Sequence, residues 1–445
     1  MNIPALPGFD PEAFRKYFTN TGWLMMARVG SIFLKMVVTA IAIPNYLGSS
    51  QNGVLNYPFV LVTFFTAACA LGMDSFVTRQ LLQQPHRQDT ILGTAFRLRL
   101  IAGLIALPAI YIVYALIDYY AAEPPAAPYR YVAIVSFSCI FQAVNIIDCF
   151  FQARVQGKYI MYIQVGANLL SAVLKMALIL WHAPIEWFVW ALLLDAVFLA
   201  IGYIYLYQRK GHSLFHWRFD SATAKHLLRY AWPLAFSSVS IILYMKIDQL
   251  MLDAYLGEAV FGVYATVVQL SEGWYFLPMA IVTALFPAIM NARRDDPVRY
   301  QRRLQHLYEL MAFLGFAIAL VMTFAAPLIY AVFYKPEYAA GAETLTVHVW
   351  AGVFMFLYVA GGQYLLAEGY TLLSLARALV GAAVNILLNV WWIPKYGMIG
   401  AAYATLITYA CTALFIIFVP KTRAQGWMIL KALFFIPTIQ RLMRR

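Results

Sequence analysis

Charged residues are scarce in this sequence. Asp, Glu, Lys and Arg make up 12% of the 445 residues, whereas 63% are hydrophobic, and the mean hydropathy is +0.71. Soluble globular domains carry about 25% charged residues, so the composition excludes that class. It predicts an all-α polytopic membrane protein.

Cysteine and histidine are also few. The cysteines Cys69, Cys139, Cys149 and Cys411 lie in apolar runs, without the spacing of a metal site or the density of a disulfide scaffold. No pair of histidine, cysteine or carboxylate residues in the sequence has the spacing of a nucleophile and its base. We therefore expect a protein that is not an enzyme and that needs no metal or cofactor.

Apolar runs of membrane-spanning length fill most of the chain. A bilayer core takes about 20 apolar residues per helix, and this length predicts twelve spans. They lie near residues 20–43, 54–73, 93–117, 130–152, 160–181, 186–207, 230–252, 261–286, 308–333, 344–367, 372–394 and 398–420. The connections between them are too short to hold a soluble domain.

Lysine and arginine are distributed unequally between the two sides of these spans. Of the 32 basic residues, 25 lie on one side, Arg377 among them, and three on the other: Arg130, Lys335 and Lys395. Because basic residues concentrate on the cytoplasmic side, both termini should be cytoplasmic. The formal charge of +12 then reflects topology, and we expect no nucleic-acid partner.

The two ends of the chain are expected to lie at the membrane surface. The first residues, MNIPALPGFDPEAFRKYF, lack an apolar core followed by a small-residue cleavage site, so this segment should remain in the mature protein. The last residues, GWMILKALFFIPTIQRLMRR, have too short an apolar run to cross and end in basic residues. This tail should rest on the anionic cytoplasmic leaflet.

A short motif recurs in the two halves of the sequence. YLGSSQNGV begins at Tyr46 and YLGEAVFGV at Tyr255, an offset of 209, and a weaker match, VGA at 165–167 and 380–382, has an offset of 215. The repeat predicts two six-helix lobes related by an axis along the membrane normal, around a central cavity. The predicted domains are a first lobe with its N-terminal segment, a linker, a second lobe and a basic tail: 1–207, 208–229, 230–420 and 421–445.

Away from the helix ends, eight charged residues lie within the predicted spans, where each costs at least about 2.5–3.5 kcal/mol unless it has a partner or water. They are Arg28, Lys35, Asp148, Lys175, Asp195, Lys246, Asp248 and Glu272. Asp148 is expected near the cytoplasmic end of its span, Asp195 near mid-depth and Lys175 toward the outer end.

Arg28 and Lys35 lie seven residues apart, so they share one helix face and are separated by about 10 Å along it. We predict that they bind an anionic ligand together with Lys175. The repeat provides an internal comparison, because a charge that the fold alone required would recur in the second half. The repeat offsets instead place uncharged residues at the three equivalent positions: Ser237, Tyr244 and Val390.

The same charges could instead be structural. Asp148 or Asp195 could neutralise the cations of the first span in permanent bridges, and lysines could extend toward an interface, as we expect of Lys246. Lys246 and Asp248 are two residues apart and so point to different faces. Asp248 could bind a coupling ion, and Glu272 could carry a proton or act as a buried hydrogen-bonded carboxyl.

Three stretches carry a family resemblance: NTGWLMMARVGSIFLKMVVTAIAIPNYLGSSQNGVLNY, ILGTAFRLRLIAG and KIDQLMLDAYLGEAVFGVYATVVQLSEGWYFLPMAIVTALFPAI. They resemble the bacterial polysaccharide-transport (O-antigen) flippases of the multidrug/oligosaccharidyl-lipid/polysaccharide exporter superfamily, and the likeness covers about residues 18–420. The resemblance implies twelve helices in two lobes that alternate between inward and outward openings. It implies an undecaprenyl-pyrophosphate-linked oligosaccharide as substrate, with Arg28 and Lys35 contacting pyrophosphate or acidic sugars.

The resemblance also implies partners and rivals. A polysaccharide polymerase and chain-length proteins would work beside such a flippase, and a proton or sodium ion could drive it. A cation-coupled multidrug exporter of the same superfamily would share the fold, although its cavity should favour acidic residues. An intramembrane glycan-modifying enzyme would need catalytic groups that we do not find in the sequence.

Overall fold

The computed structural model describes residues 27, 29–120, 124–125 and 127–436, and all regular elements in these ranges are helices. A span over Val29–Leu47 contains a π-helical turn, η1 (Val38–Ala42), and α2 (Ile43–Leu47). The helices that follow form, with this span, the N-terminal group: α3 (Ser49–Cys69), α4 (Asp74–Gln83), η2 (Pro85–Arg87), α5 (Gln88–Tyr120), α6 (Tyr129–Ser136), α7 (Ser138–Phe141), η3 (Gln142–Asn145), α8 (Ile146–Ala153), α9 (Gly157–Leu180) and α10 (Ile185–Arg209).

After η4 (Leu214–His216), the long helix α11 (Ser221–Leu256) leads to the remaining helices. These form, with α11, the C-terminal group: α12 (Glu258–Glu272), α13 (Phe276–Asp295), α14 (Pro297–Phe333), η5 (Pro336–Tyr338), α15 (Ala340–His348), α16 (Ala351–Ala367), α17 (Thr371–Leu414), η6 (Phe415–Ile417) and α18 (Arg423–Leu433).

Acidic caps begin two of the longest helices. The Asp220 carboxylate accepts a hydrogen bond from the Thr223 backbone N–H at the start of α11. Asp296 caps α14 in the same way, and Pro297 occupies the first turn, where its missing N–H costs nothing. The connection between α10 and α11 is therefore shorter than the predicted linker at 208–229.

The all-helical, multi-pass prediction is confirmed. Within the described ranges, nine helices are long and apolar enough to cross a membrane, and α15 with α16 forms a further pair bent by 45°. Helix α17 covers two predicted spans, because it doubles back at Gly397 (φ 60°) and brings Asn385 within 3.3 Å of Thr408. The predicted span at 261–286 is broken, since α12 ends at Glu272 and α13 begins at Phe276.

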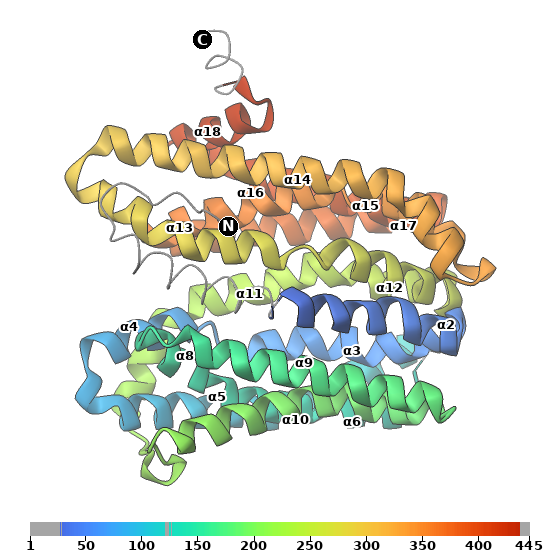
Figure 1. Ribbon diagram of the computed structural model, residues 1–445, viewed down its shortest axis with the longest axis horizontal. Coiled ribbons are helices and arrows are strands. Elements are labelled where there is room, and N and C mark those ends of the chain that lie inside the picture. The colour runs from blue at the N-terminus through green and yellow to red at the C-terminus, as the bar shows by residue number, and fades with distance from the viewer. Residues whose placement is uncertain (1–26, 28, 121–123, 126, 437–445) are drawn as a thin grey trace, which may run out of the picture.

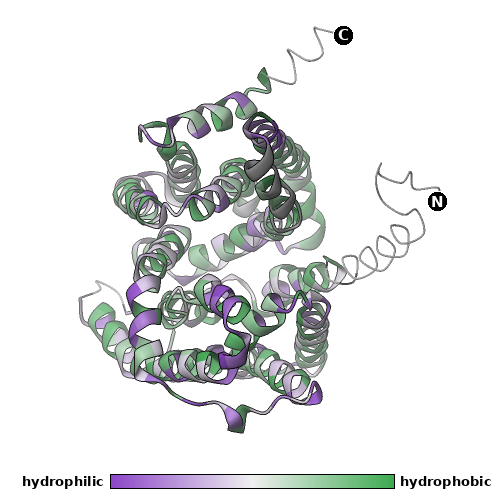
Figure 2. Cartoon of the chain, turned by 90° about the vertical axis from the view of Figure 1, so that its left-hand side faces the viewer, coloured by the Kyte–Doolittle hydropathy of each residue, from purple (hydrophilic) through white to green (hydrophobic). Residues whose placement is uncertain are grey.

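The two groups lie on opposite sides of the molecule, and α11 and α12 are the helices of the C-terminal group that adjoin the N-terminal group (Figure 1). We call its two ends the α2 end and the α4 end, after the helices found there. Hydrophobic residues dominate the helices seen from the α4 end, and hydrophilic residues mark several connections (Figure 2). Each group has its own buried core, with Tyr57, Tyr114 and Phe188 in the first and Tyr308 and Phe356 in the second.

The two copies of the repeated motif have the same backbone conformation. Gly48 has φ 84° and ψ 167°, and Gly257 has φ 83° and ψ 173°, values that a residue with a side chain rarely adopts. Each glycine precedes the first turn of a helix, α3 in one group and α12 in the other. The sequence repeat is therefore a structural repeat at this point.

Helices α3 and α12 cross at the α2 end through a second pair of equivalent glycines. A Cβ on Gly53 would lie 2.1 Å from the carbonyl oxygen of Glu258, and one on Gly262 would lie 1.8 Å from that of Ser49. Neither distance is sterically allowed, so only glycine permits this contact. The Asn52 side chain donates a hydrogen bond to the Gly262 carbonyl at 2.7 Å across the same crossing.

Candidate functional site

Three of the predicted site residues meet in the N-terminal group. The Asp195 Oδ2 atom on α10 lies 3.1 Å from Nζ of Lys35 and 2.8 Å from Nζ of Lys175 on α9. Three helices that are separate in sequence therefore contribute to one charged cluster. We call Lys35, Asp195 and Lys175 the N-terminal cation cluster.

The members of this cluster differ in accessibility. The Lys175 side chain is 2% exposed and that of Asp195 is 19% exposed, whereas that of Lys35 is 31% exposed. Lys175 is thus fixed inside the helix group, and Lys35 is the most exposed member of the cluster. The span of Lys35 also meets α9 one turn away, where Asn168 donates a hydrogen bond to the Ser31 hydroxyl at 3.4 Å.

The cluster carries more positive than negative charge. Two ammonium groups share one carboxylate oxygen, so the three ionised groups leave one net positive charge. The second oxygen, Asp195 Oδ1, has no hydrogen-bond partner in the described part of the chain. In a low-dielectric environment such a surplus attracts an anion strongly.

The remaining predicted cations and acids of this group lie elsewhere. Arg28 lies outside the described residues. Asp148 is half-buried on α8, and it is not the residue that pairs with Lys35 or Lys175. Of the two bridging partners that the sequence left open for Lys35, the structure selects Asp195. The role of the cluster in ligand binding stays a prediction.

The C-terminal group pairs its charges differently. Lys246 Nζ on α11 lies 2.6 Å from Glu272 Oε2 on α12, and the two side chains are 15% and 18% exposed. Lys246 was expected to extend toward an interface, but a carboxylate one helix away holds its ammonium group instead. This pair is balanced, one cation to one anion.

Asp248 is held by hydrogen bonds. Its carboxylate accepts from the Tyr264 hydroxyl at 2.6 Å, from Thr405 Oγ1 at 3.2 Å and from the backbone N–H of Gln249 at 2.9 Å. The residue is 1% exposed. Elsewhere on α17, the Asn389 side chain donates to Asn385 at 2.9 Å. The oxygen-rich surroundings suit a buried carboxyl that exchanges a proton or a small cation.

Two buried cations, Arg99 and Arg377, were missed by the sequence reasoning, which counted both among the basic residues of the cytoplasmic side. Arg377 lies near the start of α17 and looks like one more basic residue at a cytoplasmic helix end. The structure buries it to 1% exposure inside the C-terminal group. The small and apolar residues on both sides of it, LSLARALVG at 373–381, were the available signal.

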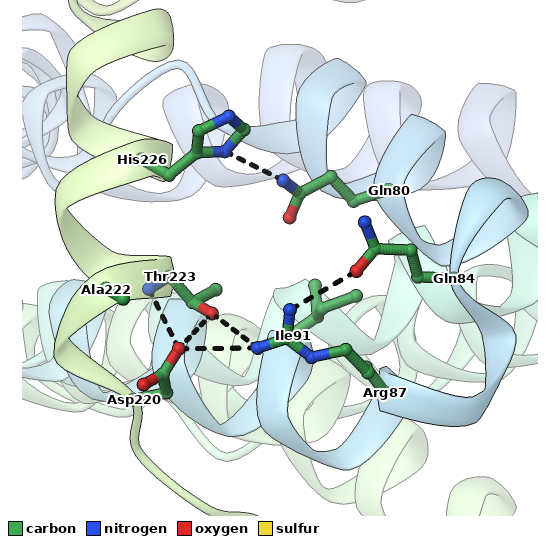
Figure 3. Close-up of a pocket in the computed structure, with 8 residues that line it drawn as sticks. All are labelled: Gln80, Gln84, Arg87, Ile91, Asp220, Ala222, Thr223 and His226. Atoms are coloured by element: carbon green, nitrogen blue, oxygen red, sulfur yellow. Dashed lines mark hydrogen bonds and ion pairs between the residues drawn. The ribbon is translucent and has the colours of Figure 1, made fainter.

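A polar pocket of about 270 Å³ lies where α11 meets the N-terminal group (Figure 3). Arg87 approaches the Asp220 carboxylate at 3.4 Å, and Gln80 hydrogen-bonds His226 at 3.0 Å. Hydrogen bonds from Thr223 to the Asp220 carboxylate lower the pKa of Asp220. These contacts attach the first turns of α11 to α4, η2 and α5.

Comparisons with known proteins agree with this architecture. The sequence profile of the family described as "Polysaccharide biosynthesis protein" matches residues 46–343, which is more than half of the chain. The chain is 26% identical over 191 residues to "Probable flippase AglR" of Haloferax volcanii, covering 40% of this chain and 38% of that protein. It is 27% identical over 182 residues to "Uncharacterized membrane protein MJ1375" of Methanocaldococcus jannaschii, covering 41% and 42%. These alignments thus span about two fifths of the curated relatives' length.

Solved structures share the fold. The "Lipid II flippase MurJ, inward closed conformation" matches with a TM-score of 0.68 at 16% identity, covering 94% of this chain and 92% of that chain. An inward-facing multidrug resistance MATE family transporter of the MOP superfamily matches with a TM-score of 0.68 at 14% identity, covering 91% and 96%. Both likenesses establish the fold, and they are equally close for a lipid flippase and a drug transporter.

Proposed function

We propose that this chain, which belongs to the family of polysaccharide biosynthesis proteins, is a flippase for a lipid-linked oligosaccharide. Its substrate would be a glycan on undecaprenyl pyrophosphate, moved from the cytoplasmic to the outer leaflet of a bacterial inner membrane for O-antigen, capsule or exopolysaccharide synthesis. The observation that carries the proposal is the surplus positive charge of the N-terminal cation cluster. Membership of the family and of this transporter fold supports it.

The cluster has the chemistry to receive a pyrophosphate. Lys35 offers an ammonium donor and Lys175 adds positive charge behind it, and phosphate oxygens accept short, charge-assisted hydrogen bonds from ammonium groups. Asp195 would hold Lys35 while no substrate is present, and a pyrophosphate would replace this single carboxylate with several anionic oxygens. Arg28, two helical turns before Lys35, would extend the same face. Lys175, which is almost fully buried, would act by positioning Asp195.

Alternating access between two lobes would carry the substrate across. We propose that the lobes are residues 1–207 and 230–420, joined by the linker at 208–229, with twelve spans around a central cavity and both termini in the cytoplasm. The basic tail at 421–445 would rest on the membrane surface. Helices α3 and α12 of the two groups cross at the α2 end, which the distribution of basic residues makes the outer end, whereas toward the α4 end the first turns of α11 contact α4 and η2. This arrangement suits a state closed to the outside.

Several polar contacts besides the glycine crossing close the α2 end. The Tyr338 hydroxyl donates to the Pro44 carbonyl at 3.0 Å. Glu337 accepts from the Ser49 backbone N–H at 3.2 Å, and the Lys335 backbone N–H donates to the Asn45 side chain at 3.0 Å. All of these bonds join the two groups, so opening to the outside would require breaking them together.

The carboxylates of the C-terminal group are candidates for coupling. Asp248 is buried and accepts hydrogen bonds from hydroxyl groups, and Glu272 forms an ion pair with Lys246. A proton or sodium ion could bind at Asp248 or at Glu272. The membrane potential offers a second source of energy, because a pyrophosphate leaving an inside-negative cell gains about 2.3 kcal/mol per charge at 100 mV. Membrane lipids, a polysaccharide polymerase and chain-length proteins would be its partners.

A cation-coupled multidrug exporter is the alternative function, because the fold matches a MATE transporter as well as a lipid flippase. An exporter of cationic drugs needs a net acidic site. The N-terminal cation cluster has the opposite sign, which favours the flippase. An intramembrane glycan-modifying enzyme is a weaker alternative, since the residues that meet in the clusters are not a nucleophile and its base.

The test is translocation of lipid-linked oligosaccharide in proteoliposomes. We expect Lys35→Ala and Arg28→Ala to slow translocation at least tenfold, since a charge-assisted hydrogen bond contributes about 1.5–3 kcal/mol. Lys421→Ala, a change of an exposed lysine outside the spans, is the matched control and should keep the wild-type rate. Wild-type transport of cationic dyes with no transport of the glycolipid would instead establish the exporter.

A further inference from the structure

The C-terminal group encloses a cation that the proposed function does not use. Arg377 lies six residues after Thr371, the first residue of α17, and its side chain is among the largest that are fully buried. In the described chain no carboxylate forms an ion pair with it. Every other buried lysine or arginine that the structure describes has a carboxylate partner: Lys175 with Asp195, and Arg99 with Asp74 at 2.8 Å.

The contacts of the guanidinium satisfy only part of it. It stacks on the ring of Tyr358, with Cζ 3.6 Å from the ring centroid, and Nη2 reaches the Tyr358 carbonyl oxygen at 3.5 Å. Nε and Nη1 have no acceptor within the described residues. Gly361 and Gly362 lie beside the guanidinium, and a Cβ on Gly362 would be 3.3 Å from Nη2. These glycines let the cation sit close to the backbone of α16.

The polar neighbours of Arg377 add donors. The hydroxyls of Tyr358, Tyr244 and Tyr409 are buried and have no hydrogen-bond partner in the described chain. The rings are adjacent, since the Tyr244 centroid is 6.4 Å from that of Tyr358 and 5.6 Å from that of Tyr409. The guanidinium therefore lies on Tyr358, the first of a chain of three adjacent tyrosines, and its neighbours Tyr358 and Tyr244 each carry a hydroxyl that can donate a hydrogen bond.

We propose that Arg377 and the tyrosines around it bind a small inorganic anion inside the C-terminal group. A buried guanidinium without a counter-charge is costly, and stacking on one aromatic ring offsets only part of that cost. An anion would accept from Nε and Nη1 and from the tyrosine hydroxyls, and it would neutralise the cation. Because the side chain is 1% exposed, the site selects ions of halide size and excludes a glycan or a lipid headgroup.

This inference goes beyond the proposed function, because it concerns a resident ion in the other half of the molecule. It explains why an arginine without an acidic partner is tolerated between α16 and α17. It also predicts that the ion stabilises the folded protein, since a ligand that binds only the native state raises its stability by mass action.

The experiment is thermal unfolding of the purified full-length protein in detergent, with sodium chloride, sodium phosphate or sodium gluconate at equal ionic strength. We expect chloride to raise the unfolding temperature of the wild type by a few degrees over gluconate. Arg377→Gln should abolish this difference, and Tyr358→Phe, which keeps the ring and removes one donor, should reduce it. Arg79→Gln, a change of an exposed arginine, should leave it unchanged.

Several outcomes would overturn the proposal. Equal unfolding temperatures in all three salts would show that no small anion is bound, and an unchanged chloride effect in Arg377→Gln would place the ion elsewhere. Stabilisation by phosphate or by phospholipid vesicles without chloride would show a phosphate ligand. If Arg377→Gln fails to fold, Tyr358→Phe and bromide located by anomalous scattering decide the question. None of these measurements depends on transport, so failure of the flippase proposal leaves them interpretable.

Discussion

The two helix groups share a repeat but treat charge in different ways. In the N-terminal group two lysines share one carboxylate, and Lys35 remains 31% exposed. The repeat places Tyr244 at the position of Lys35, and this residue is fully buried. The accessible pair of the C-terminal group, Lys246 with Glu272, is balanced. The accessible cluster of the N-terminal group therefore holds two cations to one anion, whereas the accessible pair of the C-terminal group holds one of each.

The largest expected effect concerns the shared carboxylate. Asp195→Asn leaves two ammonium groups without a counter-charge, and breaking a buried pair in this way costs about 3–5 kcal/mol of unfolding free energy. Glu272→Gln leaves a single lysine unpaired and should cost less. Denaturation of both variants in detergent measures the difference. Equal losses of unfolding free energy in the two variants would mean that the carboxylates of the two groups compensate charge to the same extent.

Adding Lys35→Met to Asp195→Asn provides the internal control. Removal of the more exposed cation should restore part of the lost stability, because one unpaired ammonium remains in place of two. A double variant as unstable as the sum of its single variants would mean that Lys35 and Asp195 do not interact in solution.

Glycolipid transport should depend on Lys35 in the N-terminal group and not on Tyr244, the equivalent residue of the C-terminal group. Lys35→Met keeps the length of the side chain and removes its charge, and we expect a loss of about tenfold to a hundredfold in glycolipid translocation. Tyr244→Phe changes the equivalent position of the second half and should keep a rate near that of the wild type. Similar losses in both variants would remove the functional asymmetry.

A substitution at the glycine crossing of α3 and α12 tests whether this contact stabilises the state that is closed at the α2 end. Gly262→Ala places a Cβ against the Ser49 carbonyl, so it should shift the equilibrium away from the state closed at the α2 end by about tenfold or 1.4 kcal/mol. Disulfide trapping of Ser50→Cys with Glu258→Cys reports that state. Gly166→Ala, where no atom lies within 4 Å, is the control. Unchanged trapping in Gly262→Ala would show that the crossing does not set this equilibrium.

The smallest effect is expected at the junction of the groups. Arg87 and Asp220 are exposed, with side-chain exposures of 44% and 35%, so Arg87→Ala should lower the unfolding temperature only slightly. The lowered pKa of Asp220 adds stability that is present at neutral pH. This contribution is lost as the pH falls through the lowered pKa. Thermal unfolding as a function of pH checks it, and a stability that rises on acidification would contradict it.

Local patterns predicted much of the fold. Apolar run lengths gave a helical membrane protein, and the recurring YLG motif identified two glycines with the same positive φ, Gly48 and Gly257. The break between α12 and α13 was not predicted, because the mean hydropathy of the run at 261–286 is high although Ser271, Glu272 and Gly273 interrupt it. Hydropathy measures the length of a run and does not report a turn within it.

The members of the N-terminal cation cluster were identified from the sequence, and the bridge between Lys35 and Asp195 was one of the alternatives that the sequence left open. Lys35, Lys175 and Asp195 were identified because ionisable residues in apolar spans are rare. Their meeting at one carboxylate oxygen depends on the rotation and tilt of three helices, which composition does not encode. Arg377 was missed for a related reason, since an arginine near a helix end has the same sequence appearance whether it faces the cytoplasm or the protein core.

The central claim is that the exposed surplus charge of the N-terminal cation cluster receives the pyrophosphate. Equilibrium binding of undecaprenyl pyrophosphate to the purified protein tests it most directly, with wild type, Lys35→Met and Lys246→Met compared at one salt concentration. The account predicts an affinity at least about tenfold weaker in Lys35→Met and near wild type in Lys246→Met. Equal affinity in all three proteins would contradict it.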